Sequence, residues 1–141
     1  AARNILTNRG LIDGSQTRLD AGALDNVGSG RLYGDHLAIR AGTVNNREEE
    51  GLAAVLAARQ RLDIGARLIN NREKALIFSA GGGSDALNIG GTLDANDQAA
   101  ASADLILNDS ATIESLGGLT VDSARLLNRN LHFRTELAQI S

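Results

Sequence analysis

The chain of 141 residues contains no cysteine, proline, methionine or tryptophan, and only three aromatic residues. Without cysteine it can form no disulfide and no thiolate metal site, and this composition is compatible with secretion. Without proline, its turns depend on residues that tolerate positive φ, and 16 glycines are present. Because 43% of the residues are hydrophobic but only 2% are aromatic, the core must consist of narrow aliphatic layers.

Charge and hydropathy argue against several classes of partner. The formal net charge is −3 and the sequence pI is about 5.3, which argues against nucleic-acid and anionic-membrane surfaces. No apolar run approaches the roughly 18 residues that a membrane-spanning helix needs. The first residues, AARNILTN, follow no initiator methionine or signal peptide and enter a repeat partway through. We therefore expect a segment cut from a longer protein.

A ten-residue phrase recurs four times along the chain. In each copy the third position is aliphatic, the eighth is aliphatic again, a small residue lies between them, and the tenth is Asn. The copies are TRLDAGALDN (17–26), LAIRAGTVNN (37–46), LDIGARLINN (62–71) and LTVDSARLLN (119–128). Such self-similarity indicates a chain built by stacking one structural unit.

The closing Asn of the phrase serves as a register marker. An aliphatic residue precedes each marker by one or two places, and the markers are Asn8, Asn26, Asn46, Asn71, Asn108 and Asn128. Subtraction of successive positions gives steps of 18, 20, 25, 37 and 20 residues. Four of these steps match one turn of a β-solenoid or one leucine-rich repeat. The 37-residue step must hold an insertion or a degenerate turn, in which the shortened phrase LNIGGTLDA (87–95) places Ile89 and Leu93 at the aliphatic positions.

Each repeat carries three short strand-like segments, because a third apolar position follows most markers. These positions are Ile12, Leu32, Val55, Ile77 and Ile113. Segments of three to five residues are too short for an independent sheet, so each must pair with the equivalent segment of the next turn. We therefore predict an all-β fold, a parallel β-helix (β-solenoid) with about six coils of roughly 20 residues and irregular insertions.

In such a coil, equivalent residues stack on one another and form columns. The first aliphatic column is Leu19, Ile39, Ile64, Ile89 and Val121, and the second is Leu24, Val44, Ile69, Leu93 and Leu126. The six Asn markers form a third column at a corner. Because a side-chain amide both donates and accepts hydrogen bonds, these residues either form a ladder along the rod or each tolerate a turn of their own.

Two stretches fit the repeat less well. Residues 51–63, GLAAVLAARQRLD, are helix-prone by composition, but a repeat phrase begins at Leu62. We predict a strand over Val55–Ala58, with a short protruding helix in residues 51–61 as the alternative. Residues 95–104, ANDQAAASAD, fit no column and indicate a protruding loop or an imperfect coil. Residues 1–141 are thus interpreted as one β-helical segment with irregular excursions near 47–54 and 95–104.

Several phrases resemble the repeats of filamentous haemagglutinin and of the large exoproteins of two-partner secretion. This family includes adhesins and contact-dependent growth-inhibition toxins of Gram-negative bacteria. The N-N-R-E element followed by an apolar strand and S-A-G is the most specific feature. The similar phrases are LTNRGLIDG (6–14), AGTVNNREE (41–49), LINNREKALIFSAGG (68–82) and LLNRNLHF (126–133).

The resemblance implies a right-handed β-helix that forms part of a long filament. It further implies export through an outer-membrane two-partner-secretion transporter and a location outside the cell, secreted or on the outer surface of a Gram-negative bacterium. Such a filament contributes to virulence by presenting adhesive surfaces or a distal toxin. The family has no catalytic residues in its repeats, so the resemblance assigns none here, and no cofactor or metal.

Few residues suggest chemistry of their own. His36 and His132 are far apart in sequence and lack the spacing of a zinc site, and there is no G-x-S-x-G elbow. The glycine run AGGGSD (80–85) lacks the G-K-[ST] of a phosphate loop and predicts a turn. A calcium-binding reading of the Gly/Asp-rich residues 81–97 fails because the spacing does not repeat. Polysaccharide-cleaving β-helix enzymes use aromatic platforms, and we expect two of the three aromatic residues here to be buried. We therefore expect no enzyme.

The charges beside two Asn markers allow two interpretations. Arg47 with Glu48–Glu50, and Arg72 with Glu73 and Lys74, are either solvated turns or a ridge that meets a receptor on a host or target cell. The expected function is a structural filament segment. The alternatives are a receptor-binding module that uses Arg47–Ala53 together with Ala95–Asp104, and a fragment of a carbohydrate-active enzyme. Because a solenoid cut across its coils exposes strand edges, we also expect end-to-end self-association of the fragment.

Overall fold

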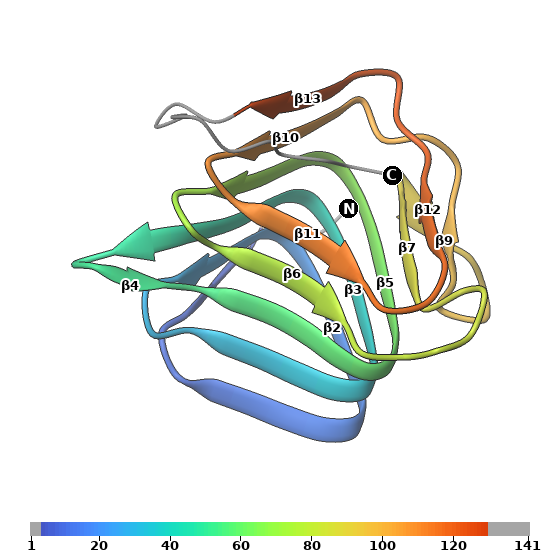
Figure 1. The fold of residues 1–141 in the computed structure, drawn as a ribbon, viewed down its shortest axis with the longest axis horizontal. Helices are drawn as coiled ribbons and strands as arrows, with labels where there is room; N and C mark the ends of the chain where they lie inside the picture. Colours follow the sequence, from blue (N-terminus) through green and yellow to red (C-terminus); the bar gives the residue numbers. More distant parts are fainter. Residues whose placement is uncertain (1–3, 130–141) are drawn as a thin grey trace.

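A computed structural model describes residues 4–129, which form strands and contain no helix. The chain winds into parallel stacked coils that make a β-solenoid of about five turns (Figure 1). All pairings between successive coils are parallel, and the two antiparallel pairings lie within excursions from the coil. The predicted all-β solenoid is confirmed, with about five turns rather than six because six Asn markers bound only five intervals.

Thirteen strands lie within the described residues, eleven of them in one continuous sheet. The first coils consist of long strands that bend around corners without a break, where the sequence predicts three short segments per coil. The later coils follow the same path in separate pieces. The strands are β1 (Ile5–Asn8), β2 (Leu11–Val27), β3 (Arg31–Glu49), β4 (Leu52–Ala53), β5 (Val55–Arg72), β6 (Leu76–Ser79), β7 (Leu87–Gly90), β8 (Thr92–Leu93), β9 (Ala99–Ala100), β10 (Leu105–Asp109), β11 (Thr112–Ser115), β12 (Leu119–Val121) and β13 (Leu126–Arg129).

Each coil has three sides, defined by the pairing register. Side one contains residues 11–14, 31–34, 55–58, 76–79 and 112–115. Side two contains residues 16–21, 36–41, 61–66, 87–90 and 119–121. Side three contains residues 5–8, 23–27, 43–47, 68–72, 105–109 and 126–129. Side chains alternate along each side between the interior and the outer surface, so each side adds one face to a shared core.

The first aliphatic column lies on side two in the predicted register. Each of its members pairs with the next, in the order Leu19, Ile39, Ile64, Ile89 and Val121. The middle members are almost completely buried. The outer members are only partly buried, because each has a neighbouring coil on one side alone. Burial of β-branched and Leu side chains in this stack is the main apolar stabilisation of the fold.

The second aliphatic column lies on side three, and the prediction is wrong at one position. The members in register are Leu24, Val44, Ile69, Ile106 and Leu126. Leu93 instead pairs antiparallel with Ala99 in the small β8–β9 sheet. The shortened phrase 87–95 looks continuous in sequence, but the chain leaves the coil after Gly90, so its second aliphatic residue never reaches side three.

On side one, the prediction for the third apolar column is wrong at one position. The Val55–Ala58 segment is a strand, and the helix alternative for residues 51–61 is wrong because β4 and β5 occupy that stretch. The inward residue, however, is Leu56, which pairs with Leu32 and Ile77 and is fully buried. Val55 points outward and is half-buried. A shift of one residue along a strand exchanges its two faces, which explains the error.

The described aromatic residues lie on the outer surface of side one, contrary to the expectation that two of the three are buried. Tyr33 and Phe78 are both half-buried and share a column, with Ala57 between them. Aliphatic residues one place earlier in each strand occupy the interior. Phe133 lies outside the described residues.

The first excursion is a hairpin that protrudes where side three meets side one. The end of β3 pairs antiparallel with β4 through Glu48–Ala53 and Glu49–Leu52. The turn between them has positive φ at Glu50 (53°) and Gly51 (81°). Although the composition of this stretch favours a helix, the chain forms a tight turn here and returns to side one.

The second excursion is a twelve-residue insertion at the corner between sides two and three. Ile64 lies five places before Ile69, whereas the equivalent Ile89 lies 17 places before Ile106. Ala103 rejoins the coil, because it forms a parallel bridge with Ser123. We call residues 91–102 the strap; they correct the predicted 95–104. The hairpin and the strap lie on opposite sides of the rod, with β4 and β9 far apart (Figure 1).

Candidate functional site: an asparagine ladder and a buried carboxylate

The six Asn markers form one continuous column on side three. In each coil the side-chain Nδ2 donates to the Oδ1 of the marker in the next coil. The five donor–acceptor distances are 3.0 Å for the first pair and 2.9 Å for the other four. The structure thus shows the ladder rather than a series of independent turns. Asn26, Asn46 and Asn71 are completely buried, while Asn128 is exposed at the end of the column.

The second amide proton of the central Asn residues is also satisfied. Asn46 donates to the carbonyl of Leu76 at 3.0 Å, and Asn71 donates to that of Thr112 at 2.8 Å. These carbonyls begin side one of another coil, so the amides tie the corner between sides three and one. A buried amide that uses both donors and its acceptor carries no desolvation penalty for an unpaired group. The ladder therefore fixes the register of the coils.

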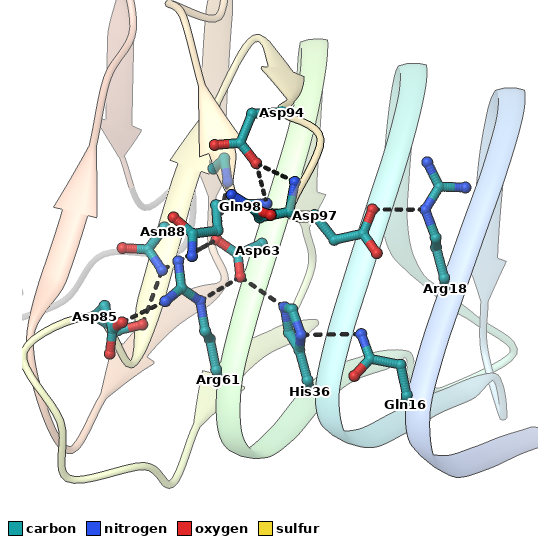
Figure 2. A network of polar contacts seen from close by, with 12 residues as sticks. Gln16, Arg18, His36, Arg61, Asp63, Asp85, Asn88, Asp94, Asp97 and Gln98 are labelled. Atoms are coloured by element: carbon teal, nitrogen blue, oxygen red, sulfur yellow. Dashed lines mark hydrogen bonds and ion pairs between the residues drawn. The ribbon is translucent and has the colours of Figure 1, made fainter.

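Side two contains a carboxylate that is buried on the outer surface of the sheet. Asp63 lies between two inward residues of β5, so its side chain points outward, yet its exposed fraction is 0%. Oδ2 accepts from Arg61 Nε at 2.6 Å and from His36 Nε2 at 2.8 Å. Oδ1 accepts from Asn88 Nδ2 at 3.1 Å and from the backbone N–H of Ala99 at 2.9 Å (Figure 2). The donors come from β3, β5, β7 and the strap.

These contacts keep Asp63 ionised. Burial opposes the charged form, but hydrogen bonds from Arg61, Ala99 and His36 outweigh it, so the pKa of Asp63 lies below its ordinary value. The hydrogen bond to Asp63 raises the pKa of Arg61 in turn. Arg61 also contacts Asp85, which lies in the loop before β7. The cluster is therefore a paired and fully hydrogen-bonded ionic group.

His36 links this cluster to the neighbouring coil. Its Nδ1 lies 3.1 Å from Nε2 of Gln16, and its Nε2 faces Asp63. A neutral imidazole that carries its proton on Nε2 satisfies both contacts, because it donates to the carboxylate and accepts from the amide. In a hydrolytic triad a nucleophilic hydroxyl or thiol would stand where the Gln16 amide stands. The pair His36–Asp63 consequently resembles a triad in two members and lacks the third.

The strap covers Asp63 by lying flat on the outer surface of side two. Ala38 and Asp63, outward residues in adjacent coils, are both fully buried beneath it. Gly65 permits the close approach, because a Cβ there would overlap the backbone of Thr92. Farther along the strap, Asp97 Oδ1 accepts from Arg18 Nε at 2.8 Å, which reaches the first coil. The strap thus spans three coils.

No protein-family model, no curated protein and no solved structure matches the chain. Within residues 4–129, no group of three or more His, Cys, Asp or Glu side chains is arranged to hold a metal ion. The same residues include no helix that is long and apolar enough to cross a membrane. The assignment of a function therefore depends on the repeat, the ladder and the strap themselves.

In the predicted charged ridge, two members form ion pairs with residues outside the ridge. Arg47 pairs with Asp25 at 3.2 Å, and Glu49 of the hairpin pairs with Arg9 at 2.7 Å. The hydrogen bond from Arg9 lowers the pKa of Glu49. Since the hairpin and the strap are on opposite sides of the rod, the predicted composite surface of Arg47–Ala53 with Ala95–Asp104 does not form. His132 lies outside the described residues.

Sequence reasoning missed the Asp63 cluster, although the aligned repeat contains a signal for it. In the register of side two, His36 pairs with Arg61, and Asp63 pairs with Asn88. Ionisable and amide groups therefore occupy two adjacent columns. The repeat phrase is defined by its inward columns, so it carries no information about the outward positions between them.

Proposed function

We propose that the chain is a structural shaft segment of a filament that belongs to a large secreted, haemagglutinin-like exoprotein. The supporting observation is the continuous in-register pairing of the Asn column from Asn8 to Asn128, in which each coil uses the preceding one as its template. Such an assembly is quasi-one-dimensional, and its length depends only on the number of coils. A rod of this kind holds other parts of a protein at a distance.

The geometry of the polar groups supports a mechanical role over a chemical one. The groups around Asp63 all donate hydrogen bonds to its carboxylate, and the Nδ1 atom of His36 is hydrogen-bonded to the side-chain amide of Gln16. A carboxylate with these partners and a depressed pKa is a poor general acid or base near neutral pH. We therefore propose a non-enzymatic protein that needs no cofactor.

The location follows from the repeat phrases. Their resemblance to two-partner-secretion exoproteins supports export through an outer-membrane transporter and display on the surface of a Gram-negative bacterium. The absence of cysteine suits a chain that crosses a membrane unfolded. In that setting the shaft serves adhesion, or it presents a distal toxin in contact-dependent growth inhibition.

Removal of one coil tests the shaft role. Deletion of residues 27–46 joins Asn26 to Arg47, and because Asn26 and Asn46 pair in register, the join preserves the ladder. We expect this variant to remain folded by circular dichroism and, within its parent protein, to reach the cell surface with adhesion or toxin delivery retained. Loss of surface delivery despite a folded segment would contradict the proposal.

One observation favours the alternative of a receptor-binding module. Tyr33 and Phe78 form an outward aromatic column on side one, and aromatic side chains at a surface are frequent anchors in recognition. Under this alternative, the double substitution Tyr33→Ser and Phe78→Ser abolishes binding to target cells while the fold persists. Under the shaft role, the same variant binds and delivers as the parent does.

A further inference from the structure

The strap is structurally separate from the coil that carries it. Its strands β8 and β9 pair with each other in a two-stranded sheet that does not join the main sheet. Its two ends meet, because a Cβ on Gly91 would overlap the carbonyl of Ser102. If residues 91–102 were removed, Ile89 would be followed by Gly90 and Ala103. The preceding coil has the same sequence pattern, in which Ile64 is followed by Gly65 and Ala66. The coil path is therefore complete without the strap.

Besides the close approach of Thr92 to Gly65, three contacts of the strap with side two can be compared. Leu93 is 8% exposed, and its strand β8 lies against β3 and β5. Asp97 forms its ion pair with Arg18 at a partly exposed position. Only the third contact, from the Ala99 N–H to Asp63, is made to a fully buried charged group. Because charge-assisted hydrogen bonds away from water are the stronger ones, Asp63 is the dominant polar anchor.

We propose that the strap is a hinged unit, latched by Asp63, that lifts off side two while the shaft beneath it stays folded. The charged group that faces Asp63 is Arg61 from β5, while β3 contributes the titratable His36 and β7 the neutral Asn88. Asp85 and Asp94 lie close enough to Arg61 to interact with its charge.

The latch depends on pH in a defined direction. The folded-state pKa of Asp63 is below its ordinary value, so the ionised carboxylate stabilises the folded chain at any pH above that ordinary value, about 3.9. The contribution disappears as the pH falls through the lower, folded-state pKa. Protonation of Asp63 in stronger acid removes the negative charge from the acceptor of the Ala99 N–H, so the strap then loses a charge-assisted hydrogen bond.

Amide hydrogen exchange on the full chain tests the latch. The Asp63→Ala variant is expected to raise the exchange rates of the strap amides, Ala99 above all, by tenfold or more. The shaft amides of Leu62 and Ile64 should stay within twofold of the parent. The matched control is Asp97→Ala, which removes the exposed anchor and should change strap exchange less than threefold. Equal acceleration of strap and shaft, or no acceleration of the strap, would overturn the proposal.

Two further measurements keep the test independent of how well Asp63→Ala folds. In the unmodified chain, lowering the pH from 5 to 2 should release the Ala99 amide before the shaft amides, after correction for intrinsic exchange. The variant lacking residues 91–102 should retain a cooperative thermal transition and the β-sheet circular dichroism of the parent. Simultaneous release of all amides in acid, or failure of the deletion variant to fold, contradicts a separable strap.

Discussion

Sides two and three of the same coils bury polar groups in opposite ways. Side three repeats one residue type, so each Asn amide finds its partner in an identical amide one coil away. Side two assembles unlike residues, and its central carboxylate is buried only because the strap covers it. In a repeated column each polar group finds its partner in the neighbouring coil. The Asp63 cluster depends instead on the strap, which is present once among the described coils.

The largest expected effect tests the core that both sides share. Ile64→Asp places a carboxylate in the middle of a fully buried column, where an unpaired charge costs several kcal/mol. We expect loss of the cooperative thermal transition, measured by circular dichroism. The exposed Gln60→Asp variant on the same strand is the control and should melt like the parent. A stable Ile64→Asp variant would show that the inward column is misassigned.

The second comparison separates the coil from the strap. Ile106→Ala removes a fully buried member of the side-three column and should cost about 2–5 kcal/mol of unfolding free energy. Leu93→Ala affects an aliphatic residue that contacts side two from the strap, so it should loosen the strap with a smaller effect on global unfolding. Urea denaturation measures both variants. Equal losses would mean that strap and coil unfold as one unit.

The ladder itself is tested by breaking one rung. Asn46→Leu leaves the Asn26 donor and the Asn71 acceptor without their partner, at a cost of about 2–4 kcal/mol. Asn128→Leu, at the exposed end, interrupts a single contact and should cost less than about 1 kcal/mol. Comparable losses from urea denaturation of the two variants would show that the column is a set of independent turns.

Acid should distinguish side two from side three. Since Asn does not titrate, acid weakens the Asp63 cluster and leaves the ladder unchanged. The parent should lose stability below about pH 3.9 in a step that the Asp63→Asn variant lacks. Calorimetry between pH 7 and pH 2.5 measures both proteins. Identical pH profiles would contradict an ionised Asp63.

The smallest effect is expected at the hairpin. Arg9→Ala removes the ion pair with Glu49, whose side chains are 55% and 34% exposed to solvent. Exposed pairs contribute little and are screened by salt, so the melting temperature should not change measurably. A clear decrease would show that the hairpin contributes to the stability of the coils.

Sequence reasoning works where the repeat is regular. The column from Leu19 to Val121 and the Asn markers follow from counting positions, because parallel stacking places equivalent residues over one another. The errors lie at irregular points. Val55, predicted in place of Leu56, directly follows the hairpin, and Leu93, predicted in place of Ile106, lies within the strap, so in both cases an excursion displaces the residue from the expected position.

The candidate site was harder to predict. No local pattern around Asp63 distinguishes a buried outward carboxylate from a solvated one, since its burial depends on residues 91–102 folding back over it. The small outward residues Ala38 and Gly65 leave room for the strap. They indicate this contact only after the coils have been aligned with one another.

The side-chain amides of the Asn column all point the same way. From Asn8 to Asn108, each nitrogen is directed toward the following coil and each oxygen toward the preceding one. The aligned dipoles polarise one another along the rod. The two ends of the described column differ, since the oxygen of Asn8 accepts from the backbone N–H of Gly10 whereas the oxygen of Asn128 accepts from the amide of Asn108. A further coil can therefore extend the amide ladder only if its own Asn amide has the same head-to-tail orientation.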